Sequence, residues 1–325
     1  MAQVAACDGI HPHGGAPFRR GQASAGRAGV RFSRDTAPVL KGLAGAAAGA
    51  AVGAAAWGWF EAGWVRLETR ELHLPRLPSE LDGLRIAHLS DFHLGVPSRG
   101  VVATRRAVEW TAERSADLIC VTGDLLSRPR AEQQLLDLLA RLGDPYVVLG
   151  NHDYALSRDP FSKPVGLLRL EHGTLLADDT VELDLRGRRV ELAGVDPRSW
   201  MRKKRSGFGE SDADLRILLC HFPRALDFVS PGRFHLILAG HMHAGQIVLP
   251  YAFGKLYLAH LRARYIEGVY ERGGTVMHVS RGLGTTFVPF RFFARPEATE
   301  LVLRSGGSAR PGGCKAAPAR RPRSR

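Results

Sequence analysis

Apolar runs in the first half of the chain alternate with amphipathic segments in a regular order. Residues 84–90 form a mostly apolar run that predicts a strand, and apolar spacing over 101–114 predicts a helix after it. We expect a buried strand at 118–122, a helix over 131–142 with a stripe of leucines, and a third strand over 145–149. Strand, helix, strand, helix, strand is the order of a layered α/β fold.

The second half of the chain is richer in short apolar runs that predict strands. They lie at 181–185, 189–192, 217–220, 236–239, 274–279 and 300–303. No internal repeat is evident in this half or in the first. We therefore expect one folded domain over residues 80–304.

An uncharged apolar stretch lies near the N-terminus. Residues 42–60 contain no charge over nineteen positions, close to the roughly 20 residues that span a bilayer. Six Lys or Arg precede this stretch, and four aromatic residues cluster at its far end, namely Trp57, Trp59, Phe60 and Trp64. Positive residues stay on the cytoplasmic side and tryptophans favour the interface. We expect a transmembrane anchor or signal segment over residues 39–65, with residues 1–38 as a basic, disordered leader.

Other interpretations of this segment stay open. Ala54 and Ala56 fit a small-residue cleavage pattern, which would make the segment a signal peptide. The run Arg31-Phe-Ser-Arg-Asp resembles a twin-arginine export signal that lacks one arginine. A soluble helix rich in Ala and Gly, or a start assigned at the wrong codon, would also give this pattern. The expected location is the cell membrane with the body extracytoplasmic, or export after cleavage.

The net charge of +13 lies mainly at the two ends of the chain. Residues 305–325 contain six Lys or Arg, no acid, and many Gly, Pro and Ser, which predicts a disordered basic tail. The folded body itself is nearly balanced in charge, so we expect no specific nucleic-acid partner. Cys120 and Cys220 lie in apolar runs without a C-x-x-C pair, which indicates core packing rather than zinc ligation or a disulfide framework.

Five apolar runs each end in residue types that bind metals. These ends are Asp91-Phe-His93, Gly123-Asp124, Gly150-Asn151-His152-Asp153, His221, and Gly240-His241-Met-His243. Ligands bind at the carboxyl ends of strands in an open α/β sheet. Side chains at i and i+2 of an extended segment point the same way, so we expect Asp91 and His93 to converge, and likewise His241 and His243. Each motif alone is weak, but all five together predict a metal site.

The order of these motifs resembles that of the calcineurin-like metallophosphoesterase family over nearly the whole body. The resemblance implies a four-layer sandwich of two mixed β-sheets flanked by helices, with two divalent metal ions. One ion would be held by Asp91, His93, Asp124 and His243, and the other by Asp124, Asn151, His221 and His241. Mixed Asp, His and Asn ligands suit Mn, Fe or Zn better than Mg. A carboxylate such as Asp124 can bridge two ions, and the implied reaction is attack by a hydroxide shared between them.

Two further residues gain roles from the resemblance. His152 would lie over the substrate phosphate, where it stabilises charge or protonates the leaving oxygen, and Asp153 would orient it. A purely structural contact is the alternative for His152. We expect His88 and His235 to be structural, and leave His260 and His278 undecided.

Additional runs resemble one branch of that family. Residues 82–86, 240–247 and 280–286 are similar to the membrane-associated bacterial phosphodiesterases related to UDP-2,3-diacylglucosamine pyrophosphohydrolases. Met242 and Ala244 depart from the Thr and Gly usual in these relatives, which affects substrate fit rather than metal binding. The expected activity is hydrolysis of phosphodiester or pyrophosphate bonds in a lipid or cell-envelope substrate, with the oligomeric state open.

Two other functions, and two features without a settled role, remain open. A nucleotide phosphodiesterase or nuclease would use the same site, and a non-catalytic metal-binding membrane protein would retain its ligands alone. The basic run at 198–205 is either a contact for anionic head groups or a solvated loop. Four phenylalanines form either an apolar lip for a lipid chain or part of the core, namely Phe287, Phe290, Phe292 and Phe293.

Overall fold

The structure is a computed structural model that describes residues 37–163, 167, 170–202, 209–306 and 314–316. Residues 1–36 of the expected leader, much of the basic run at 198–205 and most of the expected tail lie outside the described residues. The chain divides into two units, residues 1–49 and 50–325.

Helix α1 (Ala37–Ala62) contains the uncharged N-terminal stretch. Alanine has the highest intrinsic helix propensity, which favours a helix here despite the glycines. Of the helices in the described part of the chain, this one is long and apolar enough to cross a membrane, over the 25 residues Pro38–Ala62. None of its most apolar window is buried within the protein.

The first sheet has six strands in the order β1-β14-β2-β3-β4-β5. Their bounds are β1 (Arg66–Leu74), β14 (Glu297–Ser305), β2 (Arg85–Leu89), β3 (Leu118–Thr122), β4 (Tyr146–Val148) and β5 (Thr174–Leu175). Strands β2 to β5 run parallel, and β14 is antiparallel to β2. Because β1 pairs with β14 along its whole length, the folded body begins at residue 66 and not at the expected residue 80.

The second sheet has seven strands in the order β15-β12-β13-β9-β8-β7-β6. Their bounds are β15 (Cys314–Ala316), β12 (Gly268–Arg272), β13 (Thr275–Val279), β9 (Leu236–Ala239), β8 (Leu215–Leu219), β7 (Arg188–Gly194) and β6 (Asp179–Leu185). Strands β7, β8, β9 and β13 are parallel, whereas β6 is antiparallel to β7 and β12 is antiparallel to β13. Strand β15 pairs with β12 inside the tail that we expected to be disordered, so these three residues depart from that expectation.

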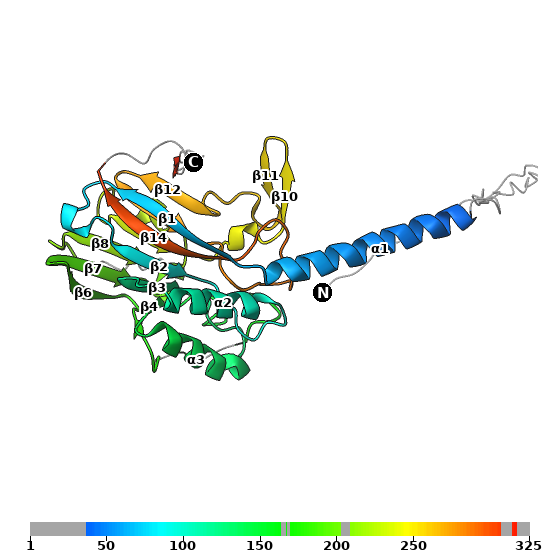
Figure 1. The fold of residues 1–325 in the computed structure, drawn as a ribbon, viewed down its shortest axis with the longest axis horizontal. Coiled ribbons are helices and arrows are strands. Elements are labelled where there is room, and N and C mark those ends of the chain that lie inside the picture. Colours follow the sequence, from blue (N-terminus) through cyan, green and yellow to red (C-terminus); the bar gives the residue numbers. More distant parts are fainter. Residues whose placement is uncertain (1–36, 164–166, 168–169, 203–208, 307–313, 317–325) are drawn as a thin grey trace, which may run out of the picture. The chain divides into compact units, whose positions relative to one another are not determined.

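Helices cover the outer faces of the two sheets, which face each other (Figure 1). Helices α2 (Gly100–Ala112) and α3 (Glu132–Leu142) pack on the first sheet, and α3 does so through the predicted leucine stripe. The shorter α4 (Pro197–Met201) and α5 (Ala225–Phe228) lie on the second sheet's outer side. Single 3-10 turns lie at Ser79–Leu81, Pro129–Ala131, His243–Gly245 and Leu258–His260. The expected α/β sandwich of two mixed sheets flanked by helices is confirmed.

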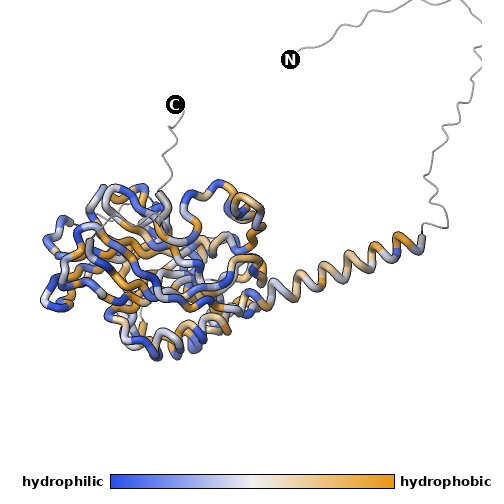
Figure 2. Tube along the Cα trace, turned by 45° about the horizontal axis from the view of Figure 1, so that its top comes forward, coloured by the Kyte–Doolittle hydropathy of each residue, from blue (hydrophilic) through white to orange (hydrophobic). Residues whose placement is uncertain are grey.

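The core between the sheets is apolar, as the hydropathy of the strands shows (Figure 2). Alternate residues of β2, β8, β9 and β14 enter it, among them Ile86, Ile217, Leu236 and Leu301. Both buried cysteines are free, as expected. Strands β10 (Val248–Tyr251) and β11 (Gly254–Tyr257) form a separate hairpin that the sequence pattern did not predict.

Candidate metal centre

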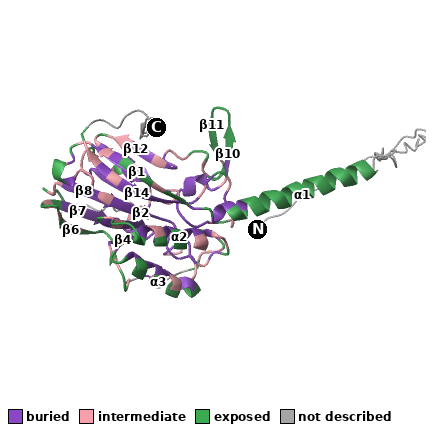
Figure 3. Cartoon of the chain, in the orientation of Figure 1, coloured by how far each residue is buried: buried purple, intermediate pink, exposed green. Residues whose placement is uncertain are grey.

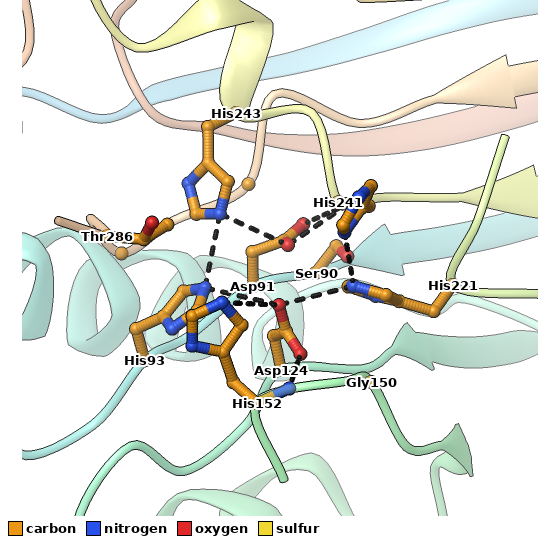
Figure 4. A network of polar contacts seen from close by, with 12 residues as sticks. Ser90, Asp91, His93, Asp124, Gly150, His152, His221, His241, His243 and Thr286 are labelled. Carbon is orange, nitrogen blue, oxygen red and sulfur yellow. Dashed lines mark hydrogen bonds and ion pairs between the residues drawn. The ribbon is translucent and has the colours of Figure 1, made fainter. Parts of the chain in front are cut away.

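The five strand-end motifs meet at one place in the structure. Strands β2, β3 and β4 of the first sheet and β8 and β9 of the second end there (Figure 4). The residues predicted as metal ligands are buried, except His241, which is half-buried. Side chains from two sheets and some 150 positions of sequence therefore share one small volume, as the sequence predicted.

The backbone that brings them together differs from the expected one. Asp91, His93, His241 and His243 have positive φ values of 55°, 47°, 73° and 48°. These motifs are therefore not extended, and our argument from i and i+2 alternation along a strand was wrong. Left-handed backbone costs energy in residues other than glycine and is concentrated at functional sites. The side chains converge because tight turns directly after β2 and β9 aim them inward.

One group of side chains consists of Asp91, His93, Asp124 and His243, whose ligand-type atoms lie within 4.8 Å of one another. His93 Nε2 lies 3.1 Å from His243 Nε2 and 3.4 Å from Asp124 Oδ2. His243 Nε2 is 3.4 Å from Asp91 Oδ1. Four donor atoms of mixed nitrogen and oxygen type thus face a common centre.

A second group consists of Asp124, His221 and His241. His221 Nε2 lies 3.2 Å from Asp124 Oδ2 and 3.1 Å from His241 Nδ1. The other oxygen of Asp124 accepts a hydrogen bond from the backbone N–H of His152 at 2.8 Å. Asp124 Oδ2 is therefore the atom that the two groups share.

The hydrogen bond of His221 Nδ1 determines which ring nitrogen, Nε2, is available as a ligand. Nδ1 lies 2.8 Å from the carbonyl oxygen of Thr122, and since a carbonyl only accepts, Nδ1 bears the proton. In the neutral ring Nε2 has a lone pair directed at Asp124 and His241, and a cation bound there would take the place of a proton. Burial lowers the pKa of His221, but the charge of Asp124 outweighs burial and raises it to about 9. The position therefore favours a positive charge.

The pKa values of the two acids of the site shift in opposite directions, although burial acts on both in the same way. Burial raises the pKa of Asp91 to about 6, and the nearby charge of Asp124 adds to that effect. Burial also opposes ionisation of Asp124, but the surrounding imidazoles, His221 foremost, hold its pKa well below the usual range. Burial lowers the pKa of His241 to about 3, so this imidazole is neutral and able to act as a ligand near pH 7.

The amide of Asn151 provides a test of whether the site fits a metal. Its Oδ1 atom is buried without a hydrogen-bond partner in the structure, and Asn151 lines the cavity beside His241. An unpaired buried oxygen costs about 1–3 kcal/mol unless something else binds it. Imidazole nitrogens, carboxylate oxygens and an amide oxygen form a donor set for Mn, Fe or Zn. The chain thus has a buried Asp/His metal-binding cluster that fits divalent ions.

Two glycines let the backbone approach the ligands closely. A Cβ at Gly150 would lie 2.1 Å from Asp124 Oδ1 and 2.5 Å from its backbone nitrogen. A Cβ at Gly240 would lie 2.4 Å from Asp91 Oδ2. Both distances are far below van der Waals contact, so any side chain at either position would displace a carboxylate of the cluster.

Asp153 does not orient His152 as the sequence suggested. Its oxygens accept hydrogen bonds from the backbone N–H groups of Leu126, at 2.9 Å, and Gly150, at 2.8 Å. Burial raises its pKa to about 7. Asp153 therefore ties the two loops that follow β3 and β4 together.

His152 is instead held by two residues that the sequence pattern did not reveal. Its Nδ1 atom contacts Ser162 Oγ within hydrogen-bond distance and lies 3.7 Å from Asp159 Oδ2. Its Nε2 atom faces the cluster, 4.0 Å from Asp124 Oδ2. Asp159 is itself fixed, because it accepts hydrogen bonds from the backbone N–H groups of Phe161 and Phe287. The loop at 156–162 therefore sets the orientation of the imidazole.

Arg291 is a further residue that the sequence did not single out. Its guanidinium is fully buried and donates to the carbonyl oxygens of Gly284, Arg281 and Ala294. Burial lowers its pKa to about 9. The guanidinium also lies 3.3 Å from His243 Nδ1, so the folded loop after β13 supports a ligand of the first group. A single arginine between phenylalanines does not by itself signal such burial.

A cavity of about 690 Å³ opens onto the cluster. Its polar floor includes Asp124, Asn151, His152 and His241. Its walls are largely apolar, and are formed by Leu156, Met201, Phe222, Ile247, Leu258, Phe287 and Val288. Of the four phenylalanines considered from the sequence, Phe287 lines the cavity and is exposed, whereas the other three are not among its lining residues.

Both the fold and the site are those of a metal-dependent phosphoesterase, and comparison with known proteins agrees. The model of the calcineurin-like phosphoesterase family matches residues 84–245, and the chain belongs to this family. A metallophosphoesterase of Bacillus subtilis, YkuE, is 31% identical over 284 residues, which cover 82% of this chain and 96% of that protein. A second one, YkoQ, is 30% identical over 66% of this chain and 82% of its own length.

A vertebrate protein is also similar. The transmembrane protein with metallophosphoesterase domain of Danio rerio is 32% identical over 258 residues. The match covers 72% of this chain and 56% of the fish protein.

Proposed function

We propose that this protein is a two-metal phosphodiesterase that hydrolyses phosphodiester or pyrophosphate bonds of an amphiphilic substrate at a membrane. The proposal rests mainly on Asp124 Oδ2, which lies between two groups of ligand-type atoms and belongs to both. One cation would be held by Asp91, His93, Asp124 and His243. A second would be held by Asp124, Asn151, His221 and His241.

The chemistry of the residues supports hydrolysis. Two bound cations would supply the charge that lowers the pKa of a water molecule and stabilises a phosphoryl group in the transition state. His152 directs Nε2 into the cavity, where it donates a proton or a hydrogen bond to an oxygen of the substrate. Ser162 and Asp159 hold its Nδ1 atom, so the ring has a fixed orientation before substrate arrives.

An amphiphilic substrate fits the cavity better than a fully polar one. The polar floor accepts a phosphate, whereas the aliphatic and aromatic walls provide contact for an acyl or prenyl chain. The 25-residue apolar helix and the transmembrane relative support a membrane location. The basic residues before that helix favour a cytoplasmic N-terminus and an extracytoplasmic catalytic domain.

Hydrolysis of bis-p-nitrophenyl phosphate by the full chain, loaded with Mn²⁺ in detergent, tests the catalytic proposal. Asp124→Asn removes the shared charge and should abolish turnover, and His152→Ala should lower kcat by roughly 10²–10⁴-fold. Asp137→Asn and His172→Ala are matched controls, because both residues are exposed and neither belongs to the ligand cluster or the cavity lining. Full activity in Asp124→Asn would refute the mechanism.

A second comparison tests the substrate class. The wild-type enzyme should hydrolyse a phosphodiester that carries an acyl chain with a higher kcat/KM than it does a mononucleotide diester or a single-stranded oligonucleotide. Preferential cleavage of the oligonucleotide would replace the proposed substrate with a nucleic acid.

A further inference from the structure

The β10–β11 hairpin presents an apolar face that the described part of the protein does not cover. In its register Leu249 pairs with Leu256 and Tyr251 with Gly254, which places these side chains on one face. Leu249, Tyr251 and Leu256 are 49%, 58% and 42% exposed, and Phe253 at the turn is 95% exposed. Figure 3 shows the hairpin as an exposed element beside a largely buried body.

The opposite face fixes the hairpin to the body. Val248 is buried, and its backbone N–H donates to the carbonyl oxygen of Phe292 at 2.9 Å. Tyr257 Oη and Lys255 Nζ both donate to Glu267 Oε1, at 2.9 and 2.7 Å. The hairpin is therefore attached through one face, and its apolar face is held outward rather than free to fold back.

The segment that holds the hairpin also holds the last turns of α1. Phe292 packs its ring against Gly58, and the backbone N–H of Arg291 donates to the Gly58 carbonyl at 3.0 Å. The rings of Trp59 and Phe290 lie edge to face with centroids 6.4 Å apart. The apolar hairpin is thus continuous, through residues 290–292, with the aromatic end of the helix that we propose to cross the membrane.

Charge and residue type fit a bilayer with anionic lipids. Residues 248–264 contain three basic residues and no acidic one. Lys255 and Arg264 pair with Glu267 and Asp227, and the exposed Arg262 is the cation of this segment that faces solvent. Exposed tryptophans lie at the end of α1, and the guanidinium of Arg295 lies 3.8 Å from the ring centre of Trp64. Aromatic rings with neighbouring cations are typical of the lipid head-group region.

The base of the same hairpin is a wall of the metal cavity. Ile247, directly before β10, and Leu258 and His260, directly after β11, all line the cavity. A membrane that contacts the outer face of the hairpin would therefore lie beside the cavity mouth. A phosphoester anchored in that membrane could reach the cluster without leaving the lipid completely.

We propose that hairpin β10–β11 is a membrane-docking element that inserts Phe253, Leu249 and Tyr251 into the bilayer beside the cavity mouth. It selects as substrate an amphiphilic phosphoester resident in that membrane. The docking itself follows from the exposed face, whereas the substrate part rests on the proposed phosphodiesterase function.

Quenching by brominated phospholipids tests the docking. The full chain is reconstituted into vesicles that contain an anionic lipid, as Phe253→Trp and as Glu182→Trp, a control on the edge strand β6. After subtraction of the parent's fluorescence, the indole added at position 253 should be quenched by the brominated lipid and the indole added at position 182 should not. Equal quenching of the two would overturn the proposal. This measurement requires neither metal nor activity.

A double variant tests the link to substrate. Leu249→Asp/Phe253→Asp should lower hydrolysis of a vesicle-embedded acyl phosphodiester at least tenfold and leave bis-p-nitrophenyl phosphate hydrolysis unchanged. Unchanged lipid hydrolysis would overturn the proposal. The hairpin would instead be a dimer interface if the parent formed a concentration-dependent dimer, the double variant did not, and the indole at position 253 was not quenched. That result would also overturn the proposal. If the indole at position 253 is quenched but the parent enzyme hydrolyses neither substrate, the result would support the docking and contradict the proposed function.

Discussion

Two buried histidines link the two sheets and should make the protein sensitive to acid. His88 on β2 and His278 on β13 are fully buried, and their Nδ1 atoms lie 2.8 Å apart across the apolar core. Ser90 Oγ donates to the Thr122 carbonyl, and Thr122 Oγ1 donates to Ser90 Oγ. Thr122 Oγ1 can then only accept from His88 Nε2, at 2.9 Å.

This order fixes the tautomers of both rings. With its proton on Nε2, neutral His88 accepts at Nδ1 from the Nδ1–H of His278. His278 Nε2 is then a buried lone pair, and it has no hydrogen-bond partner in the structure. The network has room for no additional proton on His88, since both of its nitrogens are already engaged.

The size of the expected loss of stability follows from the pKa of each histidine in the folded and unfolded states. Burial lowers the pKa of His88 to about 3 and that of His278 well below its ordinary value. A histidine with a depressed folded pKa contributes stability above its unfolded pKa, near 6.5, and loses it as the pH falls. At pH 5, His88 alone should contribute about 2 kcal/mol less to the free energy of unfolding than at pH 8. His278 should lower the free energy of unfolding further over the same pH range.

The perturbation is His88→Leu/His278→Leu, which replaces the pair by apolar side chains and leaves Thr122 bonded to Ser90. Denaturant unfolding of the metal-free full chain in detergent, from pH 8 to pH 4.5, gives the free energy of unfolding. The other titrating groups are common to both proteins, so the difference between the two pH profiles isolates the pair. The wild type should lose at least about 2 kcal/mol more than the variant between pH 8 and pH 5. Parallel profiles would refute the reasoning.

Three further perturbations address the site and its support. Gly150→Ala places a Cβ 2.1 Å from Asp124 Oδ1 and should abolish tight Mn²⁺ binding in calorimetry. Gly209→Ala, with no atom within 4 Å of the added Cβ and no left-handed backbone, should bind normally. Asp159→Asn should lower kcat on bis-p-nitrophenyl phosphate and shift the pH profile of kcat, with KM nearly unchanged, because the substitution alters how His152 is held. An unchanged pH profile would contradict this role of Asp159. Arg291→Met leaves buried carbonyls without donors and should destabilise the chain by about 3–5 kcal/mol in denaturant unfolding, while a loss below about 1 kcal/mol would show that the loop relaxes.

The sequence predicted that these side chains would come together because residue type and position coincided. Aspartate, asparagine and histidine follow apolar strands, and the parallel strands β2, β3 and β4 end at one edge, as β8 and β9 do in the second sheet. Sheet topology then brings distant residues together whatever the local turn. For that reason the predicted cluster formed although the expected extended geometry at Asp91 and His93 was wrong.

Long-range contacts account for what the sequence did not predict. Strand β1 has alternating charged residues and is defined by its pairing with β14, more than 200 residues later. The contacts of His152 Nδ1 come from Asp159 and Ser162, in a loop without periodicity, and no sequence pattern pointed to these two residues. Burial of Arg291 depends on how a whole loop folds around it, which no pattern of neighbouring residues indicates.

The most direct test of the central claim is anomalous diffraction at the manganese edge from crystals of the Mn²⁺-loaded chain. The account predicts two peaks that flank Asp124, one among Asp91, His93 and His243 and the other among Asn151, His221 and His241. Crystals grown under metal loading that show no peak at this cluster, or a single peak that does not contact Asp124, would contradict it.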